Sequence, residues 1–296
     1  MSEDGGMKRP PSALWLAFKP VGQTSFEVMK ALKQPLEGPW RLAVVHGGVL
    51  DPFASGLLVV LVGAATRLFE RLHEVPKRYI AQVQWGVETD TGDAAGQVTW
   101  ETGQVPDADA LEVATAPFLG WTEQVPPATS NKRVDGERAY VKAHRGEVVV
   151  LPASRVYLHR ARWSPGPTVS QSRVELVCRG GFFVRSVVRD LGRALGVGAH
   201  VVGLERTHIG PWACPRGALE ELRGPEVLPW LPRRSLSDEE WGAVRRGEAL
   251  RPGRSEPSAW TLPEGFPEVI GTRLVHRGKL VAVEGPGGRV VLPGGV

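Results

Sequence analysis

The feature that most constrains this chain is a turn rich in Gly, Pro and Leu that surrounds a single carboxylate. It occupies residues 46–58 and reads His-Gly-Gly-Val-Leu-Asp-Pro-Phe-Ala-Ser-Gly-Leu-Leu, with Asp51 at its centre. Its glycines can take backbone conformations closed to other residues, and Pro52 fixes the backbone after the Asp. The apolar run 57–63 that follows fits a strand buried on both faces. The pattern therefore predicts a stiff, partly desolvated carboxylate beside the core.

Asp51 is a candidate for chemistry because of these surroundings. Desolvation raises the pKa of a carboxylate and a nearby cation lowers it, and the balance sets its nucleophilicity. An Asp before Pro in a Gly-rich loop is otherwise most often a turn residue. The rest of the chain has to decide between these two interpretations.

Length and composition limit the class of protein. The chain has 296 residues, of which 42% are hydrophobic, so one large domain plus a small one fits better than a single small fold. Its apolar runs are far shorter than the roughly 20 residues of a membrane helix. The start of the chain lacks a signal-peptide core, which predicts a cytoplasmic protein. Cys178 and Cys214 form no metal or disulfide spacing pattern, and the net charge of +4 allows a polyanionic partner.

Periodicity and capping signals predict alternating strands and helices. Capping boxes at Thr24–Glu27 and Ser237–Glu240 mark two helix starts. Strands are expected at 14–18, 57–63, 77–86, 121–125, 155–163 and 174–178, with helices at 24–32, 64–72, 107–118, 184–192 and 237–246. Short strands at 269–270, 273–275, 280–283 and 290–292 complete the prediction for the tail.

Several ordered segments resemble the bacterial tRNA pseudouridine-55 synthases, the TruB family. The turn around Asp51 matches the pattern His-x-Gly-x-Leu-Asp-Pro-x-Ala-x-Gly-Leu-Leu without gaps. The other segments are Lys19-Pro20-Val21-Gly22-Gln23-Thr24-Ser25, the strand from Lys77 through Tyr79, the loop Thr89-Asp90-Thr91-Gly92-Asp93, residues 124–146, Gly181-Phe182-Phe183-Val184-Arg185 and the strand that holds Leu204. Together they cover roughly residues 19–210, and the joint match is far more specific than any single motif.

The resemblance implies a fold of the α/β (α+β) class. We expect a pseudouridine-synthase-like mixed, largely antiparallel sheet with flanking helices, followed by a small β-rich C-terminal domain that resembles PUA-like RNA-binding domains. The expected organisation is a disordered tail over 1–12, a catalytic domain over 13–235 and the PUA-like domain over 236–296. The tail strands are equally compatible with a generic small barrel.

The resemblance also implies roles for particular residues. Asp51 would be the catalytic carboxylate and Arg185 its ionic partner, while Tyr79 and Leu204 would sandwich the extruded uracil. His46 would fill the space left in the T loop by the flipped base. Asp93 and Phe183 complete the predicted substrate-binding set, and the predicted RNA-backbone contacts are Lys19, Lys132, Arg133 and Arg145.

From the residues alone, simpler interpretations stay open. Tyr79 and Leu204 could be ordinary core residues, and His46 could be a structural turn residue. Arg185 lies in the first turn of a predicted helix, where the helix dipole disfavours a cation, so it needs an anionic partner or a phosphate. The acidic loop at Asp90 and Asp93 does not complete a calcium site because the bidentate Glu is missing.

The chain departs from the family pattern at a few positions. Thr129 stands where the family usually has Tyr, Asn131 where it has Ala and His144 where it has Arg. Arg133 replaces Lys, which keeps the charge but changes the geometry of a phosphate contact, and Phe183 replaces Tyr, which removes a hydroxyl. These substitutions leave the RNA preference open.

The predicted function is isomerisation of the T-loop uridine of tRNA to pseudouridine, with no cofactor, no protein partner, no membrane contact and a monomeric enzyme. One alternative is an RNA-binding protein that helps tRNA to fold and has little turnover. The other is an enzyme that uses Asp51 to hydrolyse a glycosidic bond.

Overall fold

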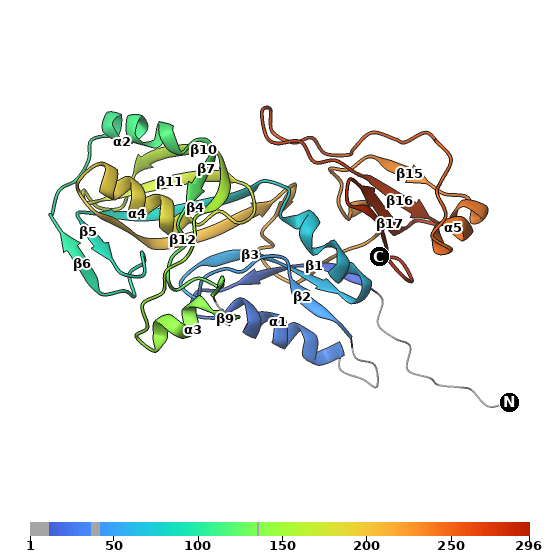
Figure 1. Ribbon diagram of the computed structural model, residues 1–296, viewed down its shortest axis with the longest axis horizontal. Helices are drawn as coiled ribbons and strands as arrows, with labels where there is room; N and C mark the ends of the chain where they lie inside the picture. The colour runs from blue at the N-terminus through green and yellow to red at the C-terminus, as the bar shows by residue number, and fades with distance from the viewer. Residues whose placement is uncertain (1–11, 37–41, 135) are drawn as a thin grey trace. The chain divides into compact units, whose positions relative to one another are not determined.

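The computed structural model describes residues 12–36, 42–134 and 136–296. These residues form two compact units, and Figure 1 labels many of their helices and strands. The described residues of Met1–Pro52, Leu57–Glu74 and Gly210–Val296 form unit 1. Unit 2 consists of Phe53–Gly56 and Val75–Ile209. The tail predicted at 1–12 lies outside the described residues, apart from Ser12.

The N-terminal part of unit 1 is a small sheet covered by one helix. Its strands are β1 (Ala13–Lys19), β2 (Val44–His46), β3 (Ser55–Val62), whose first two residues belong to unit 2, and β14 (Glu220–Leu222), in the order β14-β1-β3 with β2 on the other side of β3. Helix α1 (Ser25–Lys33) starts at the predicted capping box, where Thr24 Oγ1 accepts from the Glu27 amide at 3.1 Å. Its residue Val28 packs in one cluster with Trp15 and Leu58. The predicted first strand, first helix and buried strand are therefore confirmed.

The helix predicted at 64–72 is confirmed, and it is wound as a 3-10 helix, η2 (Gly63–Leu72). The Thr66 hydroxyl donates to the Gly63 carbonyl at 2.8 Å, so it occupies an acceptor that an α-helical amide would use. The Arg67 guanidinium donates to the Val291 carbonyl at 2.8 Å. These contacts favour a tighter winding with hydrogen bonds three residues apart.

Unit 2 is built on a twisted antiparallel sheet. Its strands are β4 (Lys77–Trp85), β7 (Gly120–Gln124), β10 (Ser154–Pro165), β11 (Gln171–Cys178) and β12 (Ala199–Ile209), in the order β12-β4-β11-β10-β7. Ser55 and Gly56 add a short parallel pairing to β12 at Glu205 and Arg206. The predicted mixed, largely antiparallel sheet is therefore confirmed.

Two helices pack against one face of this sheet (Figure 1). Side chains of α2 (Ala108–Thr115) and α4 (Val184–Ala194) share a small apolar space with strand residues such as Leu158, Val174 and Leu176. The smaller elements of the unit are β5 (Val87–Thr89), β6 (Val98–Glu101), β8 (Arg133–Val134), β9 (Glu137–Arg138), α3 (Ala139–His144) and the 3-10 turn η3 (Ala116–Phe118). The sheet thus has one face covered by helices, and this side of the unit carries α4 and its first-turn arginine.

The C-terminal part of unit 1 is β-rich, as predicted. Its sheet has the order β15-β16-β17-β18, made of Arg233–Ser235, Thr272–His276, Lys279–Gly285 and Gly288–Val291. Helix α5 (Asp238–Arg245) begins at the predicted Ser237 capping box and packs Val244 with Leu274 and Val281. Two short elements, β13 (Trp212–Ala213) and η4 (Gly224–Glu226), precede this sheet. The 3-10 turn η1 (Gln34–Leu36) belongs to the N-terminal part of the unit. The PUA-like assignment and its boundary remain predictions.

The strand predicted at 269–270 is wrong, because these residues form no ladder. The Ile270 carbonyl instead accepts from the Arg71 guanidinium at 3.1 Å. An apolar pair of β-branched residues is too short to form a strand without a neighbour in register.

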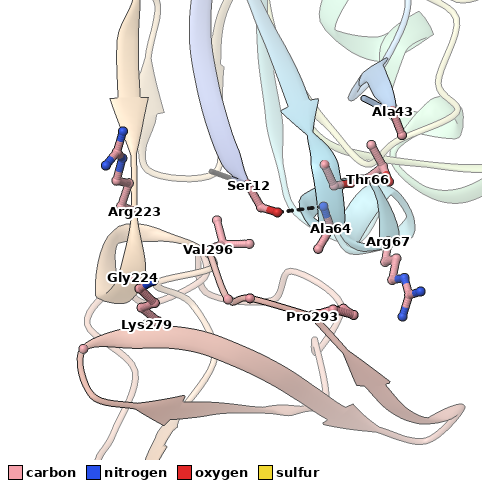
Figure 2. Close-up of a pocket in the computed structure, with 14 residues that line it drawn as sticks. Ser12, Ala43, Ala64, Thr66, Arg67, Arg223, Gly224, Lys279, Pro293 and Val296 are labelled. Atoms are coloured by element: carbon pink, nitrogen blue, oxygen red, sulfur yellow. Dashed lines mark hydrogen bonds between the residues drawn. The ribbon is translucent and has the colours of Figure 1, made fainter. Parts of the chain in front are cut away.

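Unit 1 contains a cavity of about 980 Å³ at the start of η2 (Figure 2). Its cationic lining residues are Arg67, Arg223 and Lys279, and the Ser12 hydroxyl accepts from the Ala64 amide at 2.8 Å on one wall. None of the predicted site residues lines it.

Gly56 is the position in unit 2 where a side chain would be least tolerated. Its φ is +111°, and a Cβ there would lie 2.3 Å from the Arg206 carbonyl oxygen on the paired strand. We expect Gly56→Ala to lower the unfolding free energy by about 3 kcal/mol or more, through both strain and a backbone clash. Urea denaturation measures the change.

Gly103 provides the matched control for this substitution. It also has a positive φ, +67°, but a Cβ there meets nothing within 4 Å. Gly103→Ala should therefore cost only about 1 kcal/mol, from backbone strain alone. Equal losses in the two variants would contradict the close approach at Gly56.

Candidate active site

The backbone on both sides of Asp51 is held by hydrogen bonds within unit 1. The Ser25 hydroxyl accepts from the Leu50 amide at 2.9 Å and donates to the Leu50 carbonyl at 3.2 Å. The Gly22 amide donates to the Pro52 carbonyl at 2.8 Å. Asp51 itself is half-buried between these two anchored residues. Its carboxylate therefore sits on a backbone with little freedom to move, as the turn composition predicts.

Lys19 is fully buried and supports this turn. Its ammonium donates to the carbonyls of Pro20 at 2.8 Å, Gln23 at 2.6 Å and Pro52 at 3.4 Å. Backbone carbonyls satisfy the charge, since a buried ammonium needs several acceptors. In this structure Lys19 is thus a support for the Asp51 turn, with no exposed surface for the predicted phosphate contact.

The glycines before Asp51 allow close packing of the turn. The Gly47 amide donates to the Val59 carbonyl at 2.7 Å, and a Cβ on Gly47 would lie 2.3 Å from Leu72 Cδ1. Gly48 has a φ of +139°. His46 is half-buried on β2, opposite Val60 of β3. The two glycines therefore let the backbone of the turn pack closely against the core, as their conformational freedom predicts.

Arg185 is a deeply buried cation of the predicted set, only 4% exposed. Its Nη1 donates to Asp93 Oδ2 at 3.2 Å, to the Thr91 carbonyl at 2.9 Å and to Thr129 Oγ1 at 2.7 Å. Only 5% of the Arg185 side chain and 10% of the Asp93 side chain are exposed. The anionic partner that the helix start requires is thus present in the form of Asp93, which the sequence assigned only to substrate binding.

The loop before this ion pair is organised around the Asp93 carboxylate. Its Oδ1 accepts from the Thr91 hydroxyl at 2.8 Å and from the Ala95 amide at 3.0 Å. Asp90 points elsewhere and accepts from the Gln97 amide at 2.8 Å. The two acidic residues that suggested a cation site therefore have separate structural tasks.

Gln124 fixes the residue before helix α4, a role that the sequence did not reveal. Its Oε1 accepts from the Phe183 amide at 3.0 Å, and its Nε2 donates to the Phe183 carbonyl at 3.3 Å. One step further, the Ser186 hydroxyl donates to the Val125 carbonyl at 2.8 Å. The end of β7 thus sets the direction in which α4 starts, and with it the position of Arg185. A buried Gln at a strand end was the available signal.

Tyr79 and Leu204 lie on neighbouring strands and the same face of the sheet. Leu204 pairs with Ala81, and Tyr79 is two residues from Ala81 along β4. Diagonal neighbours of this kind are within reach of an aromatic side chain. Both residues are only 8% exposed. The register therefore brings the two predicted base-contacting residues together within unit 2.

Beside Tyr79 lies a buried group of two cations and a thiol, Lys77, Arg206 and Cys178. Lys77 is 3% exposed and Arg206 1%, and the Cys178 thiol contacts the Lys77 carbonyl at 3.9 Å. Burial lowers the pKa of Lys77 to about 7, and the Arg206 charge acts in the same direction. Burial raises the pKa of the Cys178 thiol to about 12. The lysine is therefore largely uncharged in mildly alkaline solution.

The predicted RNA-backbone contacts Lys132, Arg133 and Arg145 lie on the surface. Of these three, only Arg145 forms ion pairs within the described residues. Lys132 and Arg133 are exposed, and the Arg133 guanidinium donates to the Gly136 carbonyl at 2.7 Å. Arg145 forms ion pairs with Glu137 at 2.6 Å and with Glu147 at 2.7 Å. Hydrogen bonds to the two carboxylates raise the pKa of Arg145, so it stays protonated, and the two negative charges offset its positive charge.

Comparison with known proteins identifies relatives of this chain. Residues 41–184 match the model described as TruB family pseudouridylate synthase (N terminal domain). The tRNA pseudouridine synthase B of Paenarthrobacter aurescens (strain TC1) is 35% identical over 288 residues, which are 92% of this chain and 90% of the relative. The chain belongs to the TruB family. The tRNA pseudouridine synthase B of Thermobifida fusca (strain YX) is 37% identical over 83% of this chain and 89% of its own.

Solved structures support the fold of this TruB-family chain. The "Crystal Structure of a Cbf5-Nop10-Gar1 Complex" contains a chain with a TM-score of 0.63 and 22% identity, covering 92% of this chain and 78% of that chain. A chain of an H/ACA RNP bound to a substrate RNA containing 2'-deoxyuridine also has a TM-score of 0.63, with 21% identity, covering 92% of this chain and 77% of that chain. The resemblance drawn from the sequence motifs is therefore confirmed for both family and fold.

The structure brings some of the predicted site residues together and divides the others between the units. Unit 1 contains Asp51, His46 and Lys19. Unit 2 contains Tyr79, Asp93, Phe183, Arg185 and Leu204. The predicted pairing of Asp51 with Arg185 joins the two units and stays a prediction. The side chain of His144, one of the departures from the family pattern, is outside the described part of the chain. No helix among the described residues is long and apolar enough to cross a membrane.

Thr129 should matter for the orientation of Arg185, although it departs from the family pattern. Thr129→Val removes one acceptor from a buried guanidinium, so we expect the unfolding free energy to fall by about 1.5–3 kcal/mol. We also expect the maximal rate of pseudouridylate formation to fall by roughly tenfold, since the Arg185 fork is less fixed. Urea denaturation and single-turnover kinetics measure the two effects. Thr129→Ser retains the hydroxyl and should resemble wild type, and a Val variant that matches the Ser variant would refute this role.

Lys77 should make stability depend on pH. Below pH 7 the amine is protonated both folded and unfolded, but at higher pH only the unfolded chain, with a pKa near 10.4, keeps the proton. The wild-type unfolding free energy should thus rise by up to about 1.4 kcal/mol per pH unit between pH 8 and 10, relative to Lys77→Met. Urea denaturation across this range tests it. Lys132→Met, at an exposed position, serves as control, and a constant difference between wild type and Lys77→Met would contradict the prediction.

Proposed function

We propose that this chain is a tRNA pseudouridine synthase that isomerises the T-loop uridine 55 of tRNA. The observation that carries the proposal is the alignment with a tRNA pseudouridine synthase B over 90% of that relative. The held turn around Asp51 and the buried Arg185–Asp93 pair support it, because a fixed carboxylate and a fixed cation are what this reaction requires.

The reaction consumes nothing, since every atom of the uridine is kept. The bond between N1 of uracil and C1′ of ribose breaks, the base turns, and a bond between C5 and C1′ forms. C5 then loses its proton, and N1 gains one. Asp51 acts on the ribosyl-uracil by attack at C1′, by attack at C6 or by proton abstraction, and these three routes stay open.

The remaining residues bind and position the uridine. The target base leaves the stack before reaction. Tyr79 and Leu204 then hold its two faces, as their shared sheet face permits. Arg185 keeps Asp51 ionised and oriented while Asp93 and Thr129 fix its own guanidinium. Phe183 borders the bound base, and His46 fills the vacated space in the T loop.

The binding partner is the T arm of tRNA, and we propose a monomeric, cytoplasmic enzyme that needs no other protein. The C-terminal residues 236–296 would serve as the PUA-like RNA-binding domain, next to the catalytic domain over 13–235. A tRNA-folding chaperone with little turnover is not favoured, because the relatives are synthases by name.

Asp51→Asn should abolish product while it leaves tRNA binding intact, because the amide cannot act as nucleophile or base. We expect the rate to fall by more than about a thousandfold. Purified protein is incubated with unmodified tRNA transcript in EDTA, and carbodiimide-dependent primer extension maps the uridines. Wild type should give a single stop at the T-loop uridine. Asp109→Asn, an exposed residue of the first turn of α2, is the matched control.

Two outcomes would overturn this proposal. Release of free uracil would indicate a hydrolase. Tight binding without any stop in wild type would favour the chaperone. Retained turnover in Asp51→Asn would remove Asp51 from the chemistry but leave the reaction itself in place.

A further inference from the structure

Trp121, on the edge strand β7 of unit 2, carries two guanidinium groups over its ring. The Arg155 Cζ lies 4.6 Å from the ring centroid, and the Arg179 Cζ lies 5.6 Å from it. Trp121 is 43% exposed. The three residues come from separate segments, so the sheet register, and not local sequence, brings them together. We call Trp121, Arg155 and Arg179 the edge-strand cluster.

Further rings support the cluster from below. Tyr157 pairs with Trp121 across the β7–β10 ladder, and their ring centroids are 5.2 Å apart. The Tyr157 hydroxyl lies 3.4 Å from His159 Nδ1. Tyr157 is buried, so the indole rests on a fixed base. The position of the two guanidinium groups is therefore set by rigid strands.

The charges of the cluster are not neutralised within the described part of the chain. Neither Arg155 nor Arg179 forms an ion pair there, although Glu123 is the cross-strand neighbour of Arg155. Arg160, on the same strand as Arg155, is paired in contrast, because it bonds to Glu175 at 3.1 Å. An aromatic ring holds a guanidinium by its face, so the N–H groups at the edge stay available for an anion.

We propose that the edge-strand cluster binds a phosphate group of the tRNA backbone, at a site separate from the uridine-binding residues. This inference rests on the proposed function, because it takes tRNA as the ligand. Two forks fixed on one ring match the oxygens of a phosphodiester, which accepts bidentate hydrogen bonds. A polyanion suits this surface better than a protein partner would, since two positive charges lie side by side and neither forms an ion pair within the described residues, although Glu123 is the cross-strand neighbour of Arg155.

The connectivity explains how such a contact would assist the reaction. Gln124, three residues after Trp121 on β7, clamps Phe183 before helix α4. Arg179 precedes Arg185 by six residues on the same connection. Because side chains alternate along a strand, Trp121 and Gln124 face opposite sides of β7. RNA bound at the cluster would therefore lie on one face of β7. Gln124, on the other face, holds the residue before α4 and so positions Arg185. Both faces belong to unit 2.

The test compares binding of unmodified tRNA transcript by wild type, the double variant Arg155→Gln/Arg179→Gln and Arg173→Gln. Arg173 is the matched control, since it is exposed on β11, lies outside the cluster and forms no ion pair within the described residues. Fluorescence anisotropy gives Kd between 50 and 200 mM salt. We expect the slope of log K against log[salt] to be shallower by about 1–2 in the double variant, with roughly tenfold weaker binding at 50 mM salt.

Each outcome decides one question. A double variant whose Kd and salt slope equal those of Arg173→Gln would overturn the phosphate site, even if wild type makes pseudouridine. If wild type makes no pseudouridine but the double variant loses affinity and slope, the site stands and the proposed function fails. The variant Trp121→Leu tests the ring apart from the charges. It removes the aromatic face and keeps both arginines, so we expect weaker tRNA binding. Unchanged tRNA binding would show that the ring does not position the two guanidinium groups.

Discussion

The architecture of unit 2 depends on the buried ion pair between Arg185 and Asp93. A cation in the first turn of a helix is opposed by the helix dipole, and burial adds a desolvation cost. The structure offsets both costs with a carboxylate, a backbone carbonyl and a hydroxyl on one guanidinium nitrogen. That requirement explains why the loop 89–93, the segment around Thr129 and the start of α4 meet at one point. The fold thus places a charge where local preferences oppose it.

Elements with a strong local signal could be predicted from the sequence. Two examples are the capping boxes at Thr24 and Ser237, whose hydrogen bonds join residues three positions apart. A third is strand β3, whose continuous run of apolar residues indicates burial on both faces. Elements that depend on distant partners could not. Strand β14 forms through its pairing with β1, about two hundred positions earlier, and the 3-10 winding of η2 accompanies bonds from Arg67 and Arg71 to carbonyls of the C-terminal part. Short strands such as these carry no periodicity of their own.

The same division applies to the site. Motif resemblance identified Asp93 and Arg185, and the structure adds that they contact each other. Lys19 was expected to contact the RNA backbone, but it is buried, and its ammonium donates to the nearby carbonyls of Pro20 and Gln23 and to the distant carbonyl of Pro52. Gln124, Thr129 and the edge-strand cluster act through residues far away in sequence, so their tasks become visible only once the strands are in register. What stays a prediction is the role of each residue toward the RNA.

The bond from Lys19 to Pro52 spans 33 residues of sequence and has a consequence for folding order. Strand β1 ends at this lysine, and the turn that presents Asp51 is completed only when the two segments meet. Closure of such a loop costs chain entropy before any contact repays it. The carboxylate would therefore be fixed only after β1 and the turn have met. A chain in which these two segments are still apart would contain Asp51 but would not hold its carboxylate in place for chemistry.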